Sequence, residues 1–272
     1  MPELPEVETV RRGIAPLVTN AEISAVICRV PKLRWPLTPQ LPEQLVDQRI
    51  ESVERRAKYL LFKVQRGTLI VHLGMSGVLR VVNVDTPLQK HDHVDIILKD
   101  GKCLRLNDSR RFGAVLFTET PIDDHPLFSS LGPEPLSDDF TGEVLYRRSR
   151  RSSGAIKNFI MNQKVVVGVG NIYACEALFH SGIRPTKSAA TVSKKRYWKL
   201  VDAIKLILAA AIDQGGTTIR DFAGAEGKPG YFKQSLKVYG RAGLPCTVCG
   251  QDIKNIKLAG RSTFYCPTCQ NS

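Results

Sequence analysis

The chain has 272 residues, 43% of them hydrophobic, and it carries a formal net charge of +13. This length accommodates two domains with separate cores, and the large positive charge indicates a polyanionic partner such as nucleic acid. No run of 18 apolar residues occurs, which excludes a transmembrane helix, and residues 2–12 lack the apolar segment of a secretory signal. We therefore expect a cytoplasmic protein that is not secreted.

The N-terminus reads Met-Pro-Glu-Leu-Pro-Glu, and these residues alone leave two interpretations open. Removal of Met1 would make Pro2 a secondary amine that can attack an aldehyde-like carbon and form an iminium, an electron sink. Glu3 and Glu6 would then move protons for that amine. The alternative is purely structural, because proline suits the first turn of a helix and acids suit the positive end of its dipole.

A helix is predicted over residues 3–17, because apolar residues recur there at intervals of three and four. These residues are Leu4, Val7, Val10, Ile14 and Leu17. Eight short segments of strand character follow, separated by Gly, Pro, Asn or Asp. They span residues 23–30, 49–54, 59–66, 68–73, 78–84, 93–98, 102–106 and 113–118. Regularly spaced short strands predict an antiparallel sandwich or barrel.

After a Pro- and acid-containing linker at residues 133–139, the pattern becomes helical. One helix is indicated by a stripe of apolar residues with helical spacing. The stripe consists of Tyr197, Leu200, Val201, Ile204, Leu208, Ala211 and Ile212. Three scattered cysteines with apolar neighbours, Cys28, Cys103 and Cys175, are expected to be buried free thiols. The odd total of seven cysteines favours a reducing compartment.

The tail carries two cysteine pairs, Cys246-x2-Cys249 and Cys266-x2-Cys269, with sixteen residues between them. This spacing predicts one tetrahedral zinc with a hairpin between the pairs. The zinc is structural, because four thiolates leave no open coordination position for catalysis. Lys254, Lys257 and Arg261 lie between the pairs. They suit either phosphate contact or an ordinary solvated turn.

Residues 144–175 contain no acid and carry six cationic side chains: Arg147, Arg148, Arg150, Arg151, Lys157 and Lys164. Within this stretch, Gly168-Val169-Gly170 resembles a dinucleotide fingerprint, but the third glycine is replaced by Tyr173. We therefore predict a tight turn before a helix that starts near Ile172. Asn171 would cap this helix while the amides of the turn hold a phosphate.

These features converge on one family, because the chain resembles bacterial formamidopyrimidine-DNA glycosylase over essentially its whole length. The likeness lies in residues 2–9, 55–59, 72–77, 90–95, 110–113, 168–173 and 227–232 and in the cysteine tail. It implies an α+β fold with an N-terminal antiparallel β-sandwich and flanking helices (1–132) and the linker 133–139. A helical domain with a helix-two-turn-helix (140–239) and a zinc-bound β-hairpin (240–272) would follow, and residues 217–230 would form a loop that closes over the damaged base.

The resemblance also implies the chemistry. The family members are bifunctional: they excise oxidised purines such as 8-oxoguanine and cut the strand by β- and δ-elimination. Pro2 would be the nucleophile that attacks C1′, Glu3 the acid/base and Glu6 its support. Lys58 and Arg261 would complete the catalytic set. The partner would be damaged double-stranded DNA, the cofactor one structural zinc, and the protein a monomer.

Other positions match residues that hold the DNA. The side chains that would contact it are His72, His91, Arg110, Arg111, Asn171 and Tyr239. Met75, Arg110 and Phe112 would fill the gap left when the damaged nucleotide is flipped out, which apolar and flexible side chains can do. Without the family, Met75 reads as a core residue, and the spacing of His91 and His93 permits a metal pair that lacks a third ligand nearby.

Two positions depart from the family pattern. Ser109 stands where we expect proline, which removes a restraint on φ and predicts a looser wedge loop. Asn162 stands where we expect an acid.

Two other functions stay open. The nearest is an endonuclease VIII-like glycosylase for oxidised pyrimidines, against which Leu4, the wedge residues and residues 227–232 argue. The other is a non-catalytic zinc-finger DNA-binding protein, which would leave Pro2, Glu3 and Lys58 without a purpose.

Overall fold

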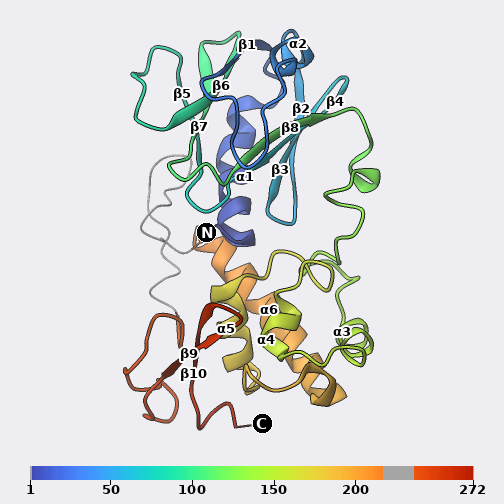
Figure 1. The fold of residues 1–272 in the computed structure, drawn as a ribbon, viewed down its shortest axis with the longest axis vertical. Helices are drawn as coiled ribbons and strands as arrows, with labels where there is room; N and C mark the ends of the chain where they lie inside the picture. Colours follow the sequence, from blue (N-terminus) through green and yellow to red (C-terminus); the bar gives the residue numbers. More distant parts are fainter. Residues whose placement is uncertain (1, 217–235, 272) are drawn as a thin grey trace. The chain divides into compact units, whose positions relative to one another are not determined.

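The computed structural model describes residues 2–216 and 236–271 (Figure 1). These residues form two compact units. The first contains residues up to Ser129 together with the described residues from Gln214 to Gly216, and the second contains Ser130–Asp213 and the described residues from Leu236 onward. Residues 217–230, the predicted lesion-capping loop, lie outside the described residues.

The first unit is an antiparallel β-sandwich with the helix α1 (Leu4–Val18) packed into it. One sheet has the strand order β1 (Ile23–Cys28), β6 (Asp92–Leu98), β7 (Lys102–Asn107) and β5 (Val78–Asn83). The other has the order β2 (Ile50–Arg56), β3 (Tyr59–Val64), β4 (Gly67–His72) and β8 (Ala114–Thr118). A short helix α2 (Leu41–Leu45) and a 3-10 turn η1 (Ile122–Asp124) complete the unit. All eight predicted strands are confirmed, and so is the sandwich.

The core of this unit lies between the two sheets and against α1. It joins apolar residues of the first sheet, such as Ile96 and Leu104, to those of the second, such as Phe62 and Val71. Along α1, however, one predicted core position is wrong: Leu17 is 42% exposed, whereas Val18 is fully buried. Starting from Ile14, a step of four residues ends about 40° from the buried face and a step of three about 60° from it, so Val18 and not Leu17 continues the stripe.

The second unit consists of short helices, one long helix and a hairpin. The helices are α3 (Gly142–Ser149), α4 (Ile156–Ile160), α5 (Asn171–His180), the 3-10 turn η2 (Ala189–Thr191) and α6 (Lys194–Asp213). The hairpin pairs β9 (Lys254–Leu258) with β10 (Arg261–Tyr265). Every apolar residue that we predicted on the buried stripe of α6 is buried. No helix of the described ranges is both long enough and apolar enough to cross a membrane.

The predicted linker, residues 133–139, packs against other parts of the second unit. The amide of Val167 donates to the carbonyl of Pro133 over 3.2 Å, and the Lys205 ammonium donates to the carbonyl of Ser137 over 2.9 Å. Among the scattered cysteines, Cys103 and Cys175 are buried as predicted, but Cys28 is exposed. Cys28 lies at the end of β1, an edge strand, where half of the side chains face solvent.

Candidate functional site

The N-terminal residues Pro2, Glu3 and Glu6 are all buried. The carboxylate of Glu6 accepts the backbone N–H of Glu3 over 2.8 Å, so it fixes the backbone directly beside Pro2. α1 begins one residue later, at Leu4. Glu6 therefore has the helix-opening role of the structural interpretation, and the same contact would hold Pro2 in a defined position.

His72 ends β4, and its imidazole is held from two sides. The ring of Tyr59 packs against it with centroids 4.7 Å apart, and the backbone N–H of Gly74 donates to Nδ1 over 3.0 Å. Burial, together with the nearby charges of Arg34 and Lys58, lowers the pKa of His72 to about 4. Since Nδ1 accepts a hydrogen bond, the neutral ring carries its proton on Nε2. His72 is thus a neutral hydrogen-bond donor, suited to a phosphate oxygen.

Replacing His72 with Asn tests this protonation state. The unfolded chain takes up a proton at His72 below its ordinary pKa of 6.5, whereas the folded chain does so only near pH 4. The free energy of unfolding therefore falls as the pH is lowered, by about 2 kcal/mol between pH 7.5 and 5 from this residue. Asn keeps an acceptor for the Gly74 amide but does not titrate. We expect urea unfolding of the variant to depend less on pH in this window, and an unchanged dependence would contradict the assignment.

The three predicted wedge residues line one cavity of about 820 Å³ in the first unit. Met75 and Phe112 are 38% and 45% exposed, and the Arg110 guanidinium lies 4.8 Å from the centre of the Phe112 ring. The core interpretation of Met75 is therefore wrong. Two cations that the sequence analysis did not single out, Lys32 and Arg34, line the same cavity together with His72 and Arg111.

Lys58 and His91 lie in connections between strands of the first unit. Lys58 is 8% exposed in the turn from β2 to β3. The carbonyl of His91 accepts the amide of Asp108 over 3.0 Å, which ties its loop to the one that carries Arg110 and Arg111. His93 is buried with Nε2 3.0 Å from the Asp108 carbonyl. In the described parts of the chain, the only group of three or more side chains that could hold a metal is the cysteine cluster, so His91 and His93 form no such group there.

In the second unit, Asn171 and Arg261 are linked through the hairpin. The Asn171 side-chain amide donates to the carbonyl of Ser262 over 3.0 Å. The predicted cap is wrong, because Asn171 is the first residue of α5 and Gly170 occupies the N-cap position. Arg261 opens β10 directly after a two-residue turn in which Ala259 and Gly260 have φ of +46° and +75°. Such left-handed turns suit tight hairpins and place Arg261 at the tip.

Two buried charged residues, Lys157 and Glu176, hold the backbone next to Arg261 and at Tyr239. Lys157 is fully buried, and its ammonium donates to the Thr263 hydroxyl over 2.6 Å and to the Ser262 carbonyl over 3.2 Å. Glu176 of α5 is 2% exposed and accepts the backbone N–H groups of three consecutive residues. These residues are Lys237, Val238 and Tyr239, at 2.8–2.9 Å. Glu176 thereby fixes the backbone of Tyr239.

The basic stretch 144–175 is only partly a cationic surface. Besides the buried Lys157, Arg150 donates to the carbonyls of Ala189 and Val192 and packs 4.2 Å from the ring of Tyr146. The remaining four cations line a second cavity of about 650 Å³: Arg147, Arg148, Arg151 and Lys164. Of these four, Arg148 also donates to the carbonyls of Lys164 and Val165. Arg150 remains exposed despite its contacts, so Lys157 is the one cation of this stretch that burial withdraws from a polyanion.

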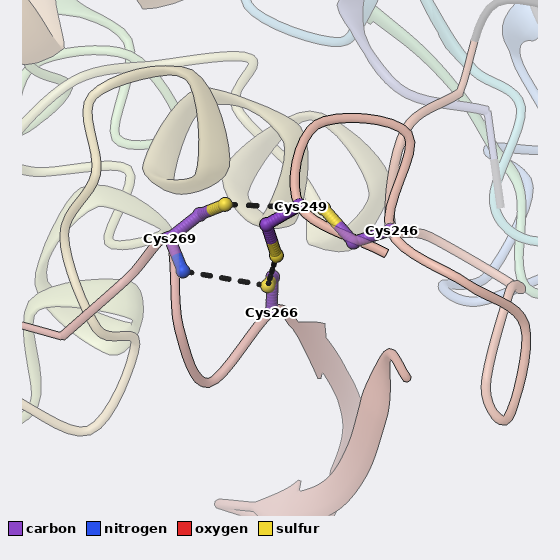
Figure 2. A group of neighbouring side chains, drawn as sticks. All are labelled: Cys246, Cys249, Cys266 and Cys269. Carbon is purple, nitrogen blue, oxygen red and sulfur yellow. Dashed lines mark hydrogen bonds between the residues drawn. The ribbon is translucent and has the colours of Figure 1, made fainter. Parts of the chain in front are cut away.

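The four tail cysteines converge on one point (Figure 2). Their sulfur atoms all lie within 4.8 Å of one another, and two of the separations are 3.9 Å (Cys246–Cys269) and 3.5 Å (Cys249–Cys266). A tetrahedral zinc with Zn–S bonds of about 2.3 Å places its sulfurs about 3.8 Å apart, so the geometry fits zinc. The amides of Val248 and Cys269 point at the sulfurs of Cys246 and Cys266, which favours thiolates.

Comparison with known proteins accounts for both units and the tail. Three family models match in succession: the formamidopyrimidine-DNA glycosylase N-terminal domain (residues 1–115), the formamidopyrimidine-DNA glycosylase H2TH domain (131–223), and the zinc finger found in FPG and IleRS (243–271). The formamidopyrimidine-DNA glycosylases of Hahella chejuensis and Pseudomonas putida GB-1 are 54% and 57% identical to it over 270 residues, 99% of this chain and 100% of each relative. The chain belongs to the formamidopyrimidine-DNA glycosylase family.

Solved structures of the family agree with this fold. The MutM (Fpg) protein of Thermus thermophilus superimposes with a TM-score of 0.90 at 36% identity, covering 100% of this chain and 99% of that one. Lactococcus lactis Fpg in complex with an abasic-site DNA gives 0.91 at 34% identity and covers both chains completely. The predicted fold class is confirmed, and the family's zinc finger together with the cysteine cluster confirms one structural zinc.

Three residues that shape the site were not predicted from the sequence: Arg34, Asp108 and Glu176. Glu176 carried a readable signal, because it is an acid inside an otherwise apolar helix and had to be satisfied by a buried partner. Asp108 adjoins the wedge residues, but its bond to Ser76 spans 32 residues and could not be read from spacing. Arg34 carried no signal, since only the fold brings its loop beside His72.

Proposed function

We propose that this chain is a bifunctional DNA glycosylase and abasic-site lyase that removes oxidised purines, including 8-oxoguanine and formamidopyrimidines, from duplex DNA. The observation that carries the proposal is membership of the formamidopyrimidine-DNA glycosylase family over the full length, with Pro2 and Glu3 held at the start of α1. The relatives are named formamidopyrimidine-DNA glycosylase, and solved Lactococcus lactis relatives are complexes with DNA that contains Fapy-dG or an abasic site.

Removal of Met1 gives Pro2 a free secondary amine. Its nitrogen lone pair attacks C1′ of the damaged nucleotide, and the bond from C1′ to the base breaks as the base leaves with a proton. A proton delivered to the ring oxygen lets the bond from C1′ to O4′ break, which opens the sugar and leaves an iminium between Pro2 and C1′. This iminium withdraws electrons from C2′, so a proton leaves C2′ and the bond from C3′ to its phosphate oxygen breaks. A second elimination breaks the bond from C5′ to its phosphate oxygen. One amine therefore serves both the excision and the strand cleavage.

Glu3 is the proton carrier of this mechanism. Its side chain lies next to Pro2 in sequence, and the Glu6 contact to its backbone N–H fixes where it starts. A carboxylate placed beside the reacting sugar can protonate the ring oxygen and later remove the C2′ proton. Lys58 and Arg261 place positive charge beside the phosphates that flank the lesion. Electrostatic contacts of this kind orient the substrate as well as bind it.

DNA binding draws on both units. In the first unit, His72 donates a neutral hydrogen bond to phosphate, while Met75, Arg110 and Phe112 occupy the gap in the stack. His91 and Arg111 extend this surface. The second unit contacts the DNA backbone through Asn171, Tyr239 and Arg261. The hairpin sets the positions of Asn171 and Arg261, and Glu176 sets that of Tyr239. A monomer that acts on chromosomal DNA would work in the bacterial cytoplasm, at the nucleoid.

The test compares two duplexes, one with 8-oxoguanine opposite cytosine and one with thymine glycol. We expect the full chain to nick the first and to leave phosphates at both ends of a one-nucleotide gap, the product of β- and δ-elimination. Nicking of only the second duplex would assign the chain to oxidised pyrimidines, as in the endonuclease VIII-like alternative. Tight binding without any cleavage would leave a zinc-finger DNA-binding protein.

A further inference from the structure

Two connections of the first unit carry the apolar wedge residues. The Met75 turn (residues 73–77) joins β4 to β5, and the Phe112 loop (residues 108–113) joins β7 to β8. Although they are separate in sequence, both present a large apolar side chain to solvent, 38% exposed at Met75 and 45% at Phe112. Two side chains that enter a base stack together need a fixed spacing. That spacing is set by the contacts between the Met75 turn and the Phe112 loop.

The carboxylate of Asp108 binds both connections at once. Its side chain is fully buried, and Oδ1 accepts the hydroxyl of Ser76 over 2.7 Å while Oδ2 accepts the backbone N–H of Gly113 over 2.7 Å. The backbone N–H of Arg110 lies 3.3 Å from Oδ1 and 3.2 Å from the Ser76 hydroxyl oxygen. One carboxylate therefore closes the Phe112 loop on itself and ties it to the Met75 turn.

The backbones of the two connections also interlock. Gly74 has φ of +64°, and a Cβ there would lie 2.4 Å from the carbonyl carbon of Phe112 and 2.5 Å from the nitrogen of Gly113. Only glycine permits this approach. Arg111, which follows Arg110, adopts a φ of +55°, a left-handed conformation that a non-glycine residue holds only when its surroundings impose it.

We propose that Asp108 and Ser76 are positioning residues that couple the Met75 turn to the Phe112 loop, so that Met75 and Phe112 enter the duplex as one preset wedge. The inference rests on the proposed function, because the wedge has a purpose only in an enzyme that flips a nucleotide out. Ser109 stands where we expected proline, and the bonds of Asp108 to the amides of Arg110 and Gly113 hold the loop on both sides of Phe112. Two loops that are ordered beforehand lose less conformational entropy on binding.

The test removes the bridge without removing the wedge. Ser76→Ala deletes the hydroxyl that joins the connections and leaves the bonds of Asp108 to Arg110 and Gly113 in place, whereas Ser76→Thr keeps a hydroxyl. Two reactions are measured for each variant: single-turnover excision from a duplex with 8-oxoguanine opposite cytosine, and borohydride trapping on single-stranded DNA with an abasic site. The second reaction needs the Pro2 amine but has no stack to fill.

We expect Ser76→Ala to slow duplex excision about tenfold, as the loss of one buried hydrogen bond does. Trapping on single-stranded DNA should stay at the wild-type rate, and Ser76→Thr should restore duplex excision. Asp108→Asn should slow duplex excision further. The asparagine NH₂ replaces an oxygen that accepts a backbone N–H, from Gly113 or from Arg110, so a donor then faces a donor. Ser24→Ala is the matched control, since it removes a serine hydrogen bond, to the Ile97 carbonyl, elsewhere in the same unit.

Equal duplex rates for Ser76→Ala and wild type would overturn the coupling. So would a parallel loss of both reactions, which would make Ser76 a general structural residue. If the wild-type chain reacts with neither DNA, the proposed function is wrong and this inference fails with it. That result is distinguishable from the other two because it is seen without any substitution.

Discussion

A variant with one glycine inserted between Met1 and Pro2 is expected to lose borohydride trapping and strand cleavage by at least about 10³-fold, as the loss of a covalent nucleophile does. In this variant the Pro2 nitrogen is an amide, whose lone pair is delocalised and cannot attack C1′. The new terminal amine stands one residue farther than the Pro2 nitrogen from the backbone N–H of Glu3, which Glu6 holds. The measurement is the single-turnover rate on the 8-oxoguanine duplex.

Two controls separate the loss of the nucleophile from the loss of the fold. Pro2→Gly keeps an amine at the same position and should retain measurable trapping. Affinity for a duplex with an uncleavable tetrahydrofuran site should be unchanged in the insertion variant, because His72, the wedge residues and Arg261 are untouched. Full activity of the insertion variant would contradict a mechanism through Pro2.

Disrupting the zinc site is expected to have the second large effect, on DNA binding. Cys249→Ser, or removal of the metal by a chelator, takes away the bonds that hold the two cysteine turns on either side of β9 and β10. Structural zinc supplies much of the folding free energy of such small domains. Arg261 then loses the hairpin tip that positions it. Affinity for the tetrahydrofuran duplex should weaken by at least about 100-fold.

The measurement pairs the dissociation constant with the zinc content of the purified chain. Wild type should hold one zinc per chain and Cys249→Ser none. Cys28→Ser is the matched control, because Cys28 is an exposed thiol outside the cluster, and it should keep both the zinc and the affinity. A zinc-free chain that binds the duplex as tightly as wild type would contradict the role of the hairpin.

What the sequence predicted well was local. The strands followed from patterns within five to seven residues. The zinc site followed from two pairs of cysteines whose spacing has few other uses. The stripe on α6 was correct because its whole helical period lies within one segment. The error at Leu17 also arose locally. Leu17 and Val18 are both apolar and both lie near the face of Ile14, so the spacing alone did not decide which of them is buried.

What the sequence could not predict depends on partners far along the chain. Lys157 looked like one more surface cation, yet its ammonium is bound to Thr263, 106 residues away. Asn171 looked like a helix cap, but its amide is taken by Ser262, 91 residues away. The coupling of Ser76 to Asp108 spans 32 residues and two different strand connections. Spacing along the chain carries no information about such contacts.

Catalysis through the Pro2 amine is tested most directly by identifying the residue that bonds to DNA. The full chain is incubated with the 8-oxoguanine duplex in the presence of borohydride, the adduct is digested with a protease, and the cross-linked peptide is sequenced by mass spectrometry. We predict that the nucleotide fragment is attached to the nitrogen of Pro2 in a peptide that lacks Met1. Attachment to a lysine side chain such as Lys58, or a peptide that retains Met1, would exclude Pro2 as the nucleophile.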